Sequence, residues 1–264
     1  MNLVSFTSDF GLRDNYVGVV KGVMLSINPN LQVIDLSHEI APFAVAQAAY
    51  TLSTACNYFP EGTVHLVVVD PGVGTDRLPL ILHTPKYDFI GPDNGIFSHI
   101  PDNKSLKNYV IRRDRIHSFY KIHPEAGSTF DGRDLFGPAA ALISKGIKPE
   151  KIADPLEDMP VLLSDMLSPE YGWQYIDVMH VDHFGNMITA LHRSYLKDKM
   201  TLRYVKIRDR LIETVSDCYQ KVQIGELLAV WGSSGYLEIS VNQGNAAKLL
   251  NYSSGKNLLE VFIE

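Results

Sequence analysis

The sequence predicts an α/β N-terminal domain followed by a smaller, antiparallel β-barrel-like C-terminal domain. Two patterns support this prediction. In the first half, the apolar run 64–69, interrupted only by His65, does not alternate with polar residues, which is typical of a strand in a parallel sheet covered on both faces. In the last third, short apolar stretches separated by turn residues indicate antiparallel strands.

The first elements along the chain are a strand, a loop and a helix. Residues 3–6 form an apolar run, and apolar residues at 17, 20, 24 and 27 have helical spacing before Asn28-Pro29 ends the helix. Further strands are expected at 80–82 and 109–111. A helix is expected over 135–144, closed by Gly146.

The domain boundary is expected where periodicity fades and prolines accumulate. Four prolines fall between residues 149 and 169, as in a linker. We therefore predict an α/β domain over 1–150, a linker over 151–172 and a β domain over 173–264. Strands of the second domain are expected at 187–191, 202–207, 227–231, 236–241 and 258–263.

Composition restricts the function and the location. The chain has 264 residues and a formal charge of −6, with no run of basic residues, so neither nucleic acid nor a membrane surface is an expected partner. No apolar run reaches the roughly 18 residues of a membrane span. Cys56 and Cys218 are far apart and lack metal-ligand spacing, which favours a reducing compartment. We therefore expect a cytoplasmic protein, and the absence of basic runs favours one that acts on a small molecule.

Several polar residues follow predicted strands directly. Asp9 and Asp14 lie in the loop after the first strand, and ligands of open α/β sheets bind at such carboxyl ends. A capping role at the following helix is an equal alternative for Asp14. Asp70 ends the strand 64–69, and Arg77 follows seven positions later, so the two are expected to form a charge-assisted pair.

The loop after Asp70 is not a nucleotide motif. Gly72-Val73-Gly74 superficially resembles a dinucleotide fingerprint, but Arg77 stands where a third glycine is needed. No Gly-Lys-Ser/Thr follows for a P-loop. Further along, the segment 128–134 either caps a helix or approaches a ligand, and the segments 182–186 and 233–236 are hairpin connections by default.

Taken together, the motifs resemble one known family. In order they are Thr-Ser-Asp-Phe-Gly at 7–11, Val-Asp-Pro-Gly-Val-Gly-Thr at 69–75, Gly-Pro-Asp-Asn-Gly at 91–95, Ser-Thr-Phe-Asp-Gly-Arg-Asp at 128–134, His-Val-Asp-His-Phe-Gly-Asn at 180–186, and Gly-Tyr-Leu-Glu-Ile followed by Val-Asn-Gln-Gly-Asn-Ala-Ala at 235–247. The chain resembles the S-adenosylmethionine hydroxide adenosyltransferase family, which is related to fluorinase and chlorinase enzymes. The resemblance covers both predicted domains.

The resemblance implies specific roles. Asp9 matches the residue that holds the ribose hydroxyls, Asp14 one at the methionine end, and Phe43 an aromatic that packs on the ligand, while Phe130 belongs to the same substrate site. Asp182 and Ser233 match methionine contacts, and Phe184 and Asn186 match adenine contacts. The implied catalytic set is Asp70, Arg77 and Asp131, where Asp131 replaces the histidine of the family and so changes the proton inventory.

The implied reaction is attack of water or hydroxide on the ribose C5′ of S-adenosylmethionine, which gives adenosine and L-methionine. The resemblance also implies a homotrimer with sites between subunits, and no metal or other cofactor is expected. Three alternatives remain: a non-catalytic S-adenosylmethionine or adenosine binding protein, a metal-dependent hydrolase using Asp9, Asp70, Asp93, Asp131 and a histidine, and a halogenase.

Overall fold

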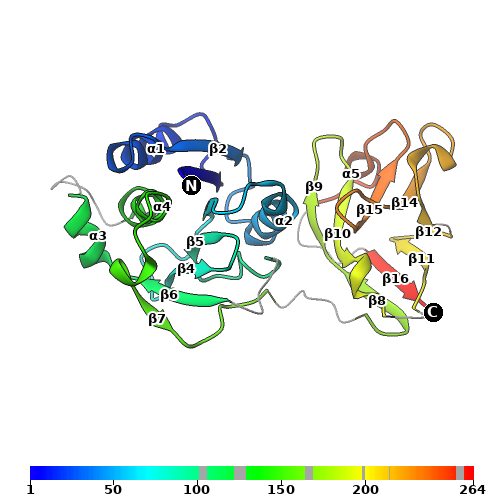
Figure 1. The fold of residues 1–264 in the computed structure, drawn as a ribbon. Helices are drawn as coiled ribbons and strands as arrows, with labels where there is room; N and C mark the ends of the chain where they lie inside the picture. Colours follow the sequence, from blue (N-terminus) through cyan, green and yellow to red (C-terminus); the bar gives the residue numbers. More distant parts are fainter. Residues whose placement is uncertain (101–105, 122–128, 164–168, 198–199, 214, 254–258) are drawn as a thin grey trace. The chain divides into compact units, whose positions relative to one another are not determined.

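The computed structural model describes residues 1–100, 106–121, 129–163, 169–197, 200–213, 215–253 and 259–264 (Figure 1). The chain forms two compact units, Met1–Leu163 and Ser164–Glu264, and the family-like motifs are divided between them. Within the described ranges, no helix combines the length and the apolar character that crossing a membrane requires. Both cysteines are free thiols.

The first unit is built on a seven-stranded sheet. Its strands are β1 (Leu3–Ser8), β2 (Gln32–Ser37), β3 (Val64–Val68), β4 (Pro79–His83), β5 (Asp88–Pro92), β6 (Lys107–Ile111) and β7 (Ala153–Leu156), in the order β2-β1-β3-β5-β4-β6-β7. The first four strands in this order are parallel, and the other pairings are antiparallel. Residues 153–156 form β7, which pairs with β6. They were expected in the linker 151–172, but they belong to this sheet and to the first unit.

Helices cover both faces of this sheet. They are α1 (Tyr16–Ile27), α2 (Val45–Ala55), α3 (Arg113–Phe119) and α4 (Gly137–Ser144), with short 3₁₀ turns η1 (Cys56–Tyr58) and η4 (Pro149–Lys151). Alternate residues along β3 and directly after it point to opposite faces: Leu66 and Val68 pack in one core with α1 and α4, whereas Val67 and Val69 pack in another with α2. The unalternating apolar run is therefore explained by burial on both faces, which are covered by different helices (Figure 1).

Two helix starts differ from the sequence-based expectation. The helix expected from 135 begins as a π-helical turn, η3 (Gly132–Phe136), which continues into α4. At α1 the N-cap residue is Asn15, and its side chain makes no capping hydrogen bond. Asp14 is therefore not the cap of α1, and the structural alternative for this residue is wrong.

The second unit contains two sheets. The strands are β8 (Gly172–Ile176), β9 (Val178–Val181), β10 (Met187–His192), β11 (Leu202–Ile207), β12 (Arg210–Ile212), β13 (Val215–Ser216), β14 (Leu227–Trp231), β15 (Tyr236–Val241) and β16 (Leu259–Ile263). They form the orders β13-β14-β15-β10-β9 and β12-β11-β16-β8. Short helical segments η5 (Arg193–Tyr195), η6 (Tyr219–Lys221) and α5 (Ala246–Leu249) complete the described part of this unit.

The C-terminal unit is not purely antiparallel. β13 runs parallel to β14, although the other described pairings of this unit are antiparallel. The described pairings give two open sheets around one apolar core, and they do not close into a barrel. Leu258, expected to start the last strand, lies outside the described residues.

Candidate active site

Two neighbouring strands bring the first carboxylates together. β1 and β3 are parallel and adjacent, and Ser8 at the end of β1 lies opposite Val68 at the end of β3. Asp9 and Asp70 follow these positions by one and two residues. Because carboxyl ends of parallel strands meet at one edge of a sheet, both side chains reach the same region.

That region is a pocket of about 430 Å³ in the first unit. It is lined by Asp9, Phe10, Tyr16, Pro42, Phe43, Val68, Asp70, Val73, Thr129, Phe130, Asp131 and Gly132. Five residues predicted for the site therefore share one cavity: Asp9, Phe43, Asp70, Phe130 and Asp131. Asp14 is exposed and is not part of the lining, and Arg77 contacts the lining carboxylates without lining the pocket itself.

Arg77 and Asp70 form the expected ion pair. Nε of Arg77 donates to Oδ1 and Oδ2 of Asp70 at 3.1 and 3.0 Å, and Nη2 donates to Oδ2 at 2.5 Å. Gly72 permits this return of the chain, because a Cβ at this position would lie 3.2 Å from Cγ of Arg77. The glycine-containing turn thus brings Arg77 back onto Asp70.

Asp131 joins the pair from the other side. Nη2 of Arg77 donates to Oδ2 of Asp131 at 2.5 Å, and Oδ1 of Asp131 accepts from Nη2 of Arg113 at the start of α3. Two carboxylates and two guanidinium groups therefore form one chain, Asp70–Arg77–Asp131–Arg113. Arg113 lies outside the sequence motifs, and it was not predicted to be a site residue.

The environment of Arg77 is controlled by its two carboxylates. Burial alone would lower the pKa of Arg77, but its hydrogen bonds to Asp70 and Asp131 and their negative charges raise that pKa above its ordinary value. The guanidinium also lies 5.2 Å from the ring centre of Phe136. Arg77 is thus a fixed positive charge behind the two carboxylates that face the pocket.

Asp9 is in a different situation. Its Oδ2 accepts the backbone N–H of Phe43 at 2.9 Å, and no arginine or lysine pairs with it among the described residues. Phe43 has a φ of 68°, unusual for a non-glycine residue, and its side chain is 69% exposed. Asp9 therefore retains acceptor capacity toward the pocket.

Aromatic rings form a wall of the same pocket. Phe130 meets Phe10 and Tyr16 with ring centres 5.5 and 5.4 Å apart, in edge-to-face geometry. Phe10 and Tyr16 were not predicted as site residues. The signal that identifies them is their nearness in the chain to Asp9 and Asp14: Phe10 follows Asp9 in the loop after β1, and Tyr16 begins α1 two residues after Asp14.

The segment that supplies Phe130 and Asp131 does not use its acids as helix caps. Asp131, the N-cap of η3, makes no capping hydrogen bond, and the buried Asp134 pairs with Arg133, whose Nε and Nη2 donate at 2.6 and 2.7 Å. Neither acid therefore caps the helix, although capping was one of the two roles expected for the segment 128–134. Ser128, the first residue of this motif, lies outside the described residues.

The second unit holds the other predicted contacts. β9 and β10 form the expected hairpin, in which Oδ1 and Oδ2 of Asp182 accept from the backbone N–H and side-chain amide of Asn186, both at 2.8 Å. Phe184 at the turn is 73% exposed. Ser233 is exposed in the β14–β15 connection.

The five-stranded sheet has a polar side. Leu237, Ile239 and Val241 pack in the apolar core, so Glu238 between them faces the other side of the sheet. Tyr219 donates to Oε2 of Glu238 at 3.0 Å. Burial and then the charge of Glu238 raise the pKa of Tyr219 to about 12, while burial and the charge of Asp182 raise the pKa of Glu238.

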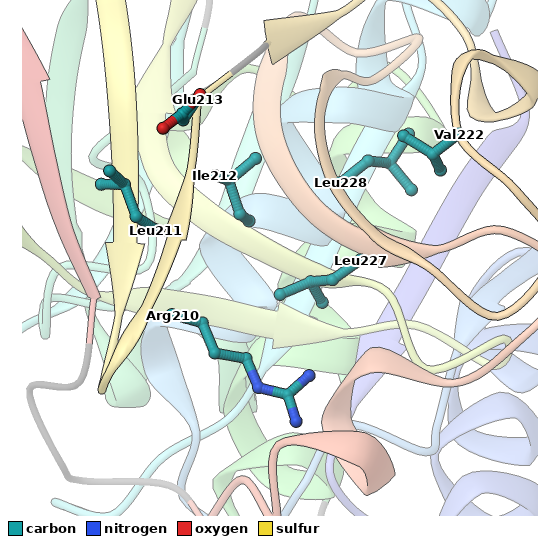
Figure 2. A pocket seen from close by; sticks show the side chains of 7 residues that line it. All are labelled: Arg210, Leu211, Ile212, Glu213, Val222, Leu227 and Leu228. Carbon is teal, nitrogen blue, oxygen red and sulfur yellow. The ribbon is translucent and has the colours of Figure 1, made fainter.

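A second pocket, of about 440 Å³, lies on the C-terminal unit (Figure 2). It is lined by Arg210, Leu211, Ile212, Glu213, Val222, Leu227 and Leu228. Its walls are mainly aliphatic, and in Figure 2 the charged groups of Arg210 and Glu213 lie at opposite ends of the view. No residue predicted for the site lines it.

The carboxylates do not fit the metal-dependent alternative. Asp70 and Asp131 are engaged by arginines, and Asp93 accepts the backbone N–H of Val161 at 2.7 Å. Within the described ranges, His, Cys, Asp and Glu side chains form no group of three or more that could hold a metal ion. A cation beside Arg77 would also meet its positive charge.

Comparisons with known proteins agree with the motif order. The family model described as "SAM hydroxide adenosyltransferase N-terminal domain" matches residues 4–153, and its C-terminal counterpart matches 176–259. Proteins named (R)-S-adenosyl-L-methionine hydrolase from Methanocaldococcus jannaschii and Thermus thermophilus are each 35% identical, over 95% and 97% of this chain and 92% and 98% of theirs. A fluorinase from Nocardia brasiliensis is 26% identical.

A solved structure shows the same fold. The crystal structure of an uncharacterized conserved protein from Thermotoga maritima matches with a TM-score of 0.83 and 32% identity, covering 98% of this chain and 99% of that one. The match covers both units, so the two-domain architecture is common to both proteins.

Proposed function

The chain belongs to the S-adenosylmethionine hydroxide adenosyltransferase family, and we infer that it is an enzyme that hydrolyses S-adenosyl-L-methionine to adenosine and L-methionine. The supporting observation within the structure is one pocket that contains a free acceptor carboxylate, Asp9, and a fixed ionic chain, Asp70–Arg77–Asp131. Asp9 is suited to accept hydrogen bonds from ribose hydroxyls, and the ionic chain is suited to hold a water molecule.

The reaction needs orientation more than acid catalysis. The oxygen of water bonds to C5′, the C5′–S bond breaks, and its electron pair converts the sulfonium into the neutral thioether of methionine. The proton of the water leaves by way of Asp70, whose oxygens retain lone pairs beyond those used by Arg77. Arg77 lies between the two carboxylates and offsets one of their two negative charges, so the water is held in line in a pocket of low dielectric.

Substrate recognition is assigned from the same resemblance. Asp9 accepts hydrogen bonds from the two ribose hydroxyls, for which its free lone pairs are available. Phe43 and Phe130 pack on the ligand, and Asp14 contacts the methionine end. Asp182 and Ser233 also contact methionine, while Phe184 and Asn186 hold adenine.

The active assembly is a cytoplasmic homotrimer in this proposal, with each site completed by a neighbouring subunit. The family motifs in both halves of the chain support it. Light scattering should give about three times the 29.5 kDa of one chain. A mass of one chain at working concentration would contradict the proposal.

One experiment tests the activity. Purified protein is incubated with S-adenosyl-L-methionine in H₂¹⁸O, and the products are identified by chromatography and mass spectrometry. Adenosine carrying ¹⁸O at the 5′ oxygen, together with unlabelled methionine, is expected. Binding without product would favour a non-catalytic binding protein, and a 5′-halogenated nucleoside formed in chloride or fluoride would favour a halogenase.

The same incubation separates the metal-dependent alternative. The reaction requires no metal or other cofactor in this proposal, since the sulfonium is already an activated leaving group. Activity should therefore persist in a chelator. Loss of activity that magnesium or manganese restores would overturn this part of the proposal.

A further inference from the structure

Arg113 does not line the pocket and lies outside the sequence motifs. It contacts neither the cavity lining at Asp9 nor Asp70, but its Nη2 donates to Oδ1 of Asp131. We propose that Arg113 is a positioning residue for the hydrolysis, because it holds Asp131 and through it the guanidinium of Arg77. This inference rests on the proposed function for its kinetic test.

The buried ionic chain is neutral only when Arg113 is included. The side chains of Asp70 and Asp131 are each 6% exposed, and that of Arg77 is 11% exposed. One guanidinium between two carboxylates would leave a net negative charge in a largely buried place, which is costly. Arg113 supplies the second positive charge and makes the four-residue chain neutral.

The position of the Arg77 guanidinium depends on Asp131. A single nitrogen of Arg77, Nη2, lies 2.5 Å from both Oδ2 of Asp70 and Oδ2 of Asp131. Its direction therefore depends on where the carboxylate of Asp131 lies. Arg113 binds the other oxygen of that carboxylate, so both oxygens of Asp131 are fixed by opposite partners.

The backbone of α3 gives Arg113 a fixed base. The N–H of Arg112 donates to the carbonyl of Ile152 at 2.9 Å, and Ile116 one turn further on is fully buried in the core. The side chain of Arg113 is 42% exposed, but its Nη2 reaches the buried carboxylate of Asp131.

The neighbouring arginines have other partners, which provides a matched control. Nη2 of Arg115 donates to Asp154 at 2.6 Å and its Nη1 donates to the carbonyl of Ala153 at 2.9 Å. Its side chain is 38% exposed, close to the value for Arg113. Arg115→Ala therefore removes a comparable ion pair from the same helix without touching Asp131.

The test compares kcat and KM for S-adenosyl-L-methionine in Arg113→Ala, Arg113→Lys and Arg115→Ala. Arg113→Ala should lower kcat about tenfold, as for loss of one hydrogen bond between charged groups, and should change KM less than threefold. Arg113→Lys should recover part of the loss, because a lysine keeps the charge without the planar fork. Arg115→Ala should match the wild type.

Asp131→Asn completes a double-mutant cycle. If Arg113 acts through Asp131, Arg113→Ala should cost little further kcat in the Asp131→Asn background. Additive losses, equal losses in Arg113→Ala and Arg115→Ala, or wild-type kcat in Arg113→Ala would each overturn the proposal.

Crystal structures separate this inference from the proposed function. If the wild type releases no adenosine, the proposed function fails. The positioning role is then decided by the side-chain geometry of Arg77 in crystals of the wild type and of Arg113→Ala. Nη2 of Arg77 should leave Asp131 in the variant, and an unchanged contact would refute the positioning role.

Discussion

Two sets of carboxylates line the same pocket, and they differ in their partners. Asp9 accepts one backbone N–H and has no charged partner among the described residues. Asp70 and Asp131 share Arg77, and Asp131 also binds Arg113. A carboxylate with free lone pairs is suited to binding a ligand, whereas carboxylates held by arginines are suited to fixing a geometry. Asp9 should therefore control affinity, and the arginine-bound pair should control turnover.

The largest effect is expected at Arg77. Arg77→Met leaves two buried carboxylates side by side without their common cation, so kcat should fall roughly 10²–10³-fold, the range for loss of one preorganised electrostatic group. Steady-state kinetics with S-adenosyl-L-methionine measure this, with circular dichroism to confirm folding. Arg77→Lys should recover only part, because an ammonium cannot reproduce the fork. Full activity in Arg77→Met would contradict the proposal that the arginine-bound carboxylates control turnover.

Asp9→Ala tests the binding side of this comparison. Loss of hydrogen bonds to a charged group should weaken binding by roughly 1.5–3 kcal/mol. Calorimetry should show this loss for both S-adenosyl-L-methionine and adenosine, since both contain the ribose hydroxyls, but not for methionine.

Asp14→Ala is the matched comparison, because Asp14 lies in the same loop outside the pocket lining. It should leave adenosine binding unchanged. Unchanged adenosine affinity in Asp9→Ala would remove Asp9 from the ribose site.

A smaller change is expected for Asp131→Asn. The amide keeps the size and one acceptor oxygen but loses the charge that both arginines bind, so kcat should fall by about tenfold. The apparent affinity should change less, because the group acts on the attacking water rather than on the substrate. A larger change in KM than in kcat would place Asp131 with Asp9, on the binding side of the comparison.

The smallest effect concerns pH and is needed to interpret the others. His65, on β3 before Asp70, is fully buried, and burial lowers its pKa to about 4 from 6.5. The unfolded chain therefore binds the proton more readily, so stability is lost as pH falls below 6.5. At pH 5.5 the loss is about 1 kcal/mol.

Urea unfolding at pH 7.5 and 5.5 measures this loss, with His65→Gln as the variant that should lack it. His117→Gln, which changes an exposed histidine in the last turn of α3, is the control. An equal pH effect in wild type and His65→Gln would exclude His65 as the cause.

Local signals predicted much of the first unit. The apolar runs located β1, β3, β4 and β6, and the helical spacing located α1. Elements with little burial escaped this approach. β2 lies at the edge of its sheet and has no buried residue, and α3 buries only Ile116, so neither shows a clear apolar period.

The C-terminal unit shows the same limit in another form. Apolar stretches predicted β10, β11, β14, β15 and β16, but they do not specify which strands pair. The parallel contact of β13 with β14 involves two residues of each strand, too few for a sequence pattern. Pairing depends on long-range contacts that the alternation of side chains does not encode.

By itself, the sequence determined the order of motifs, and hence the family, and it placed Asp9 and Asp70 at strand ends. It also predicted the pair of Asp70 with Arg77, because a short turn with Gly72 connects them. Only the tertiary structure decided that Asp131 meets Arg77 across 54 positions and Arg113 across 18. The physical reason is that these contacts depend on how β3, η3 and α3 pack, and side chains on separate elements leave no common period in the chain.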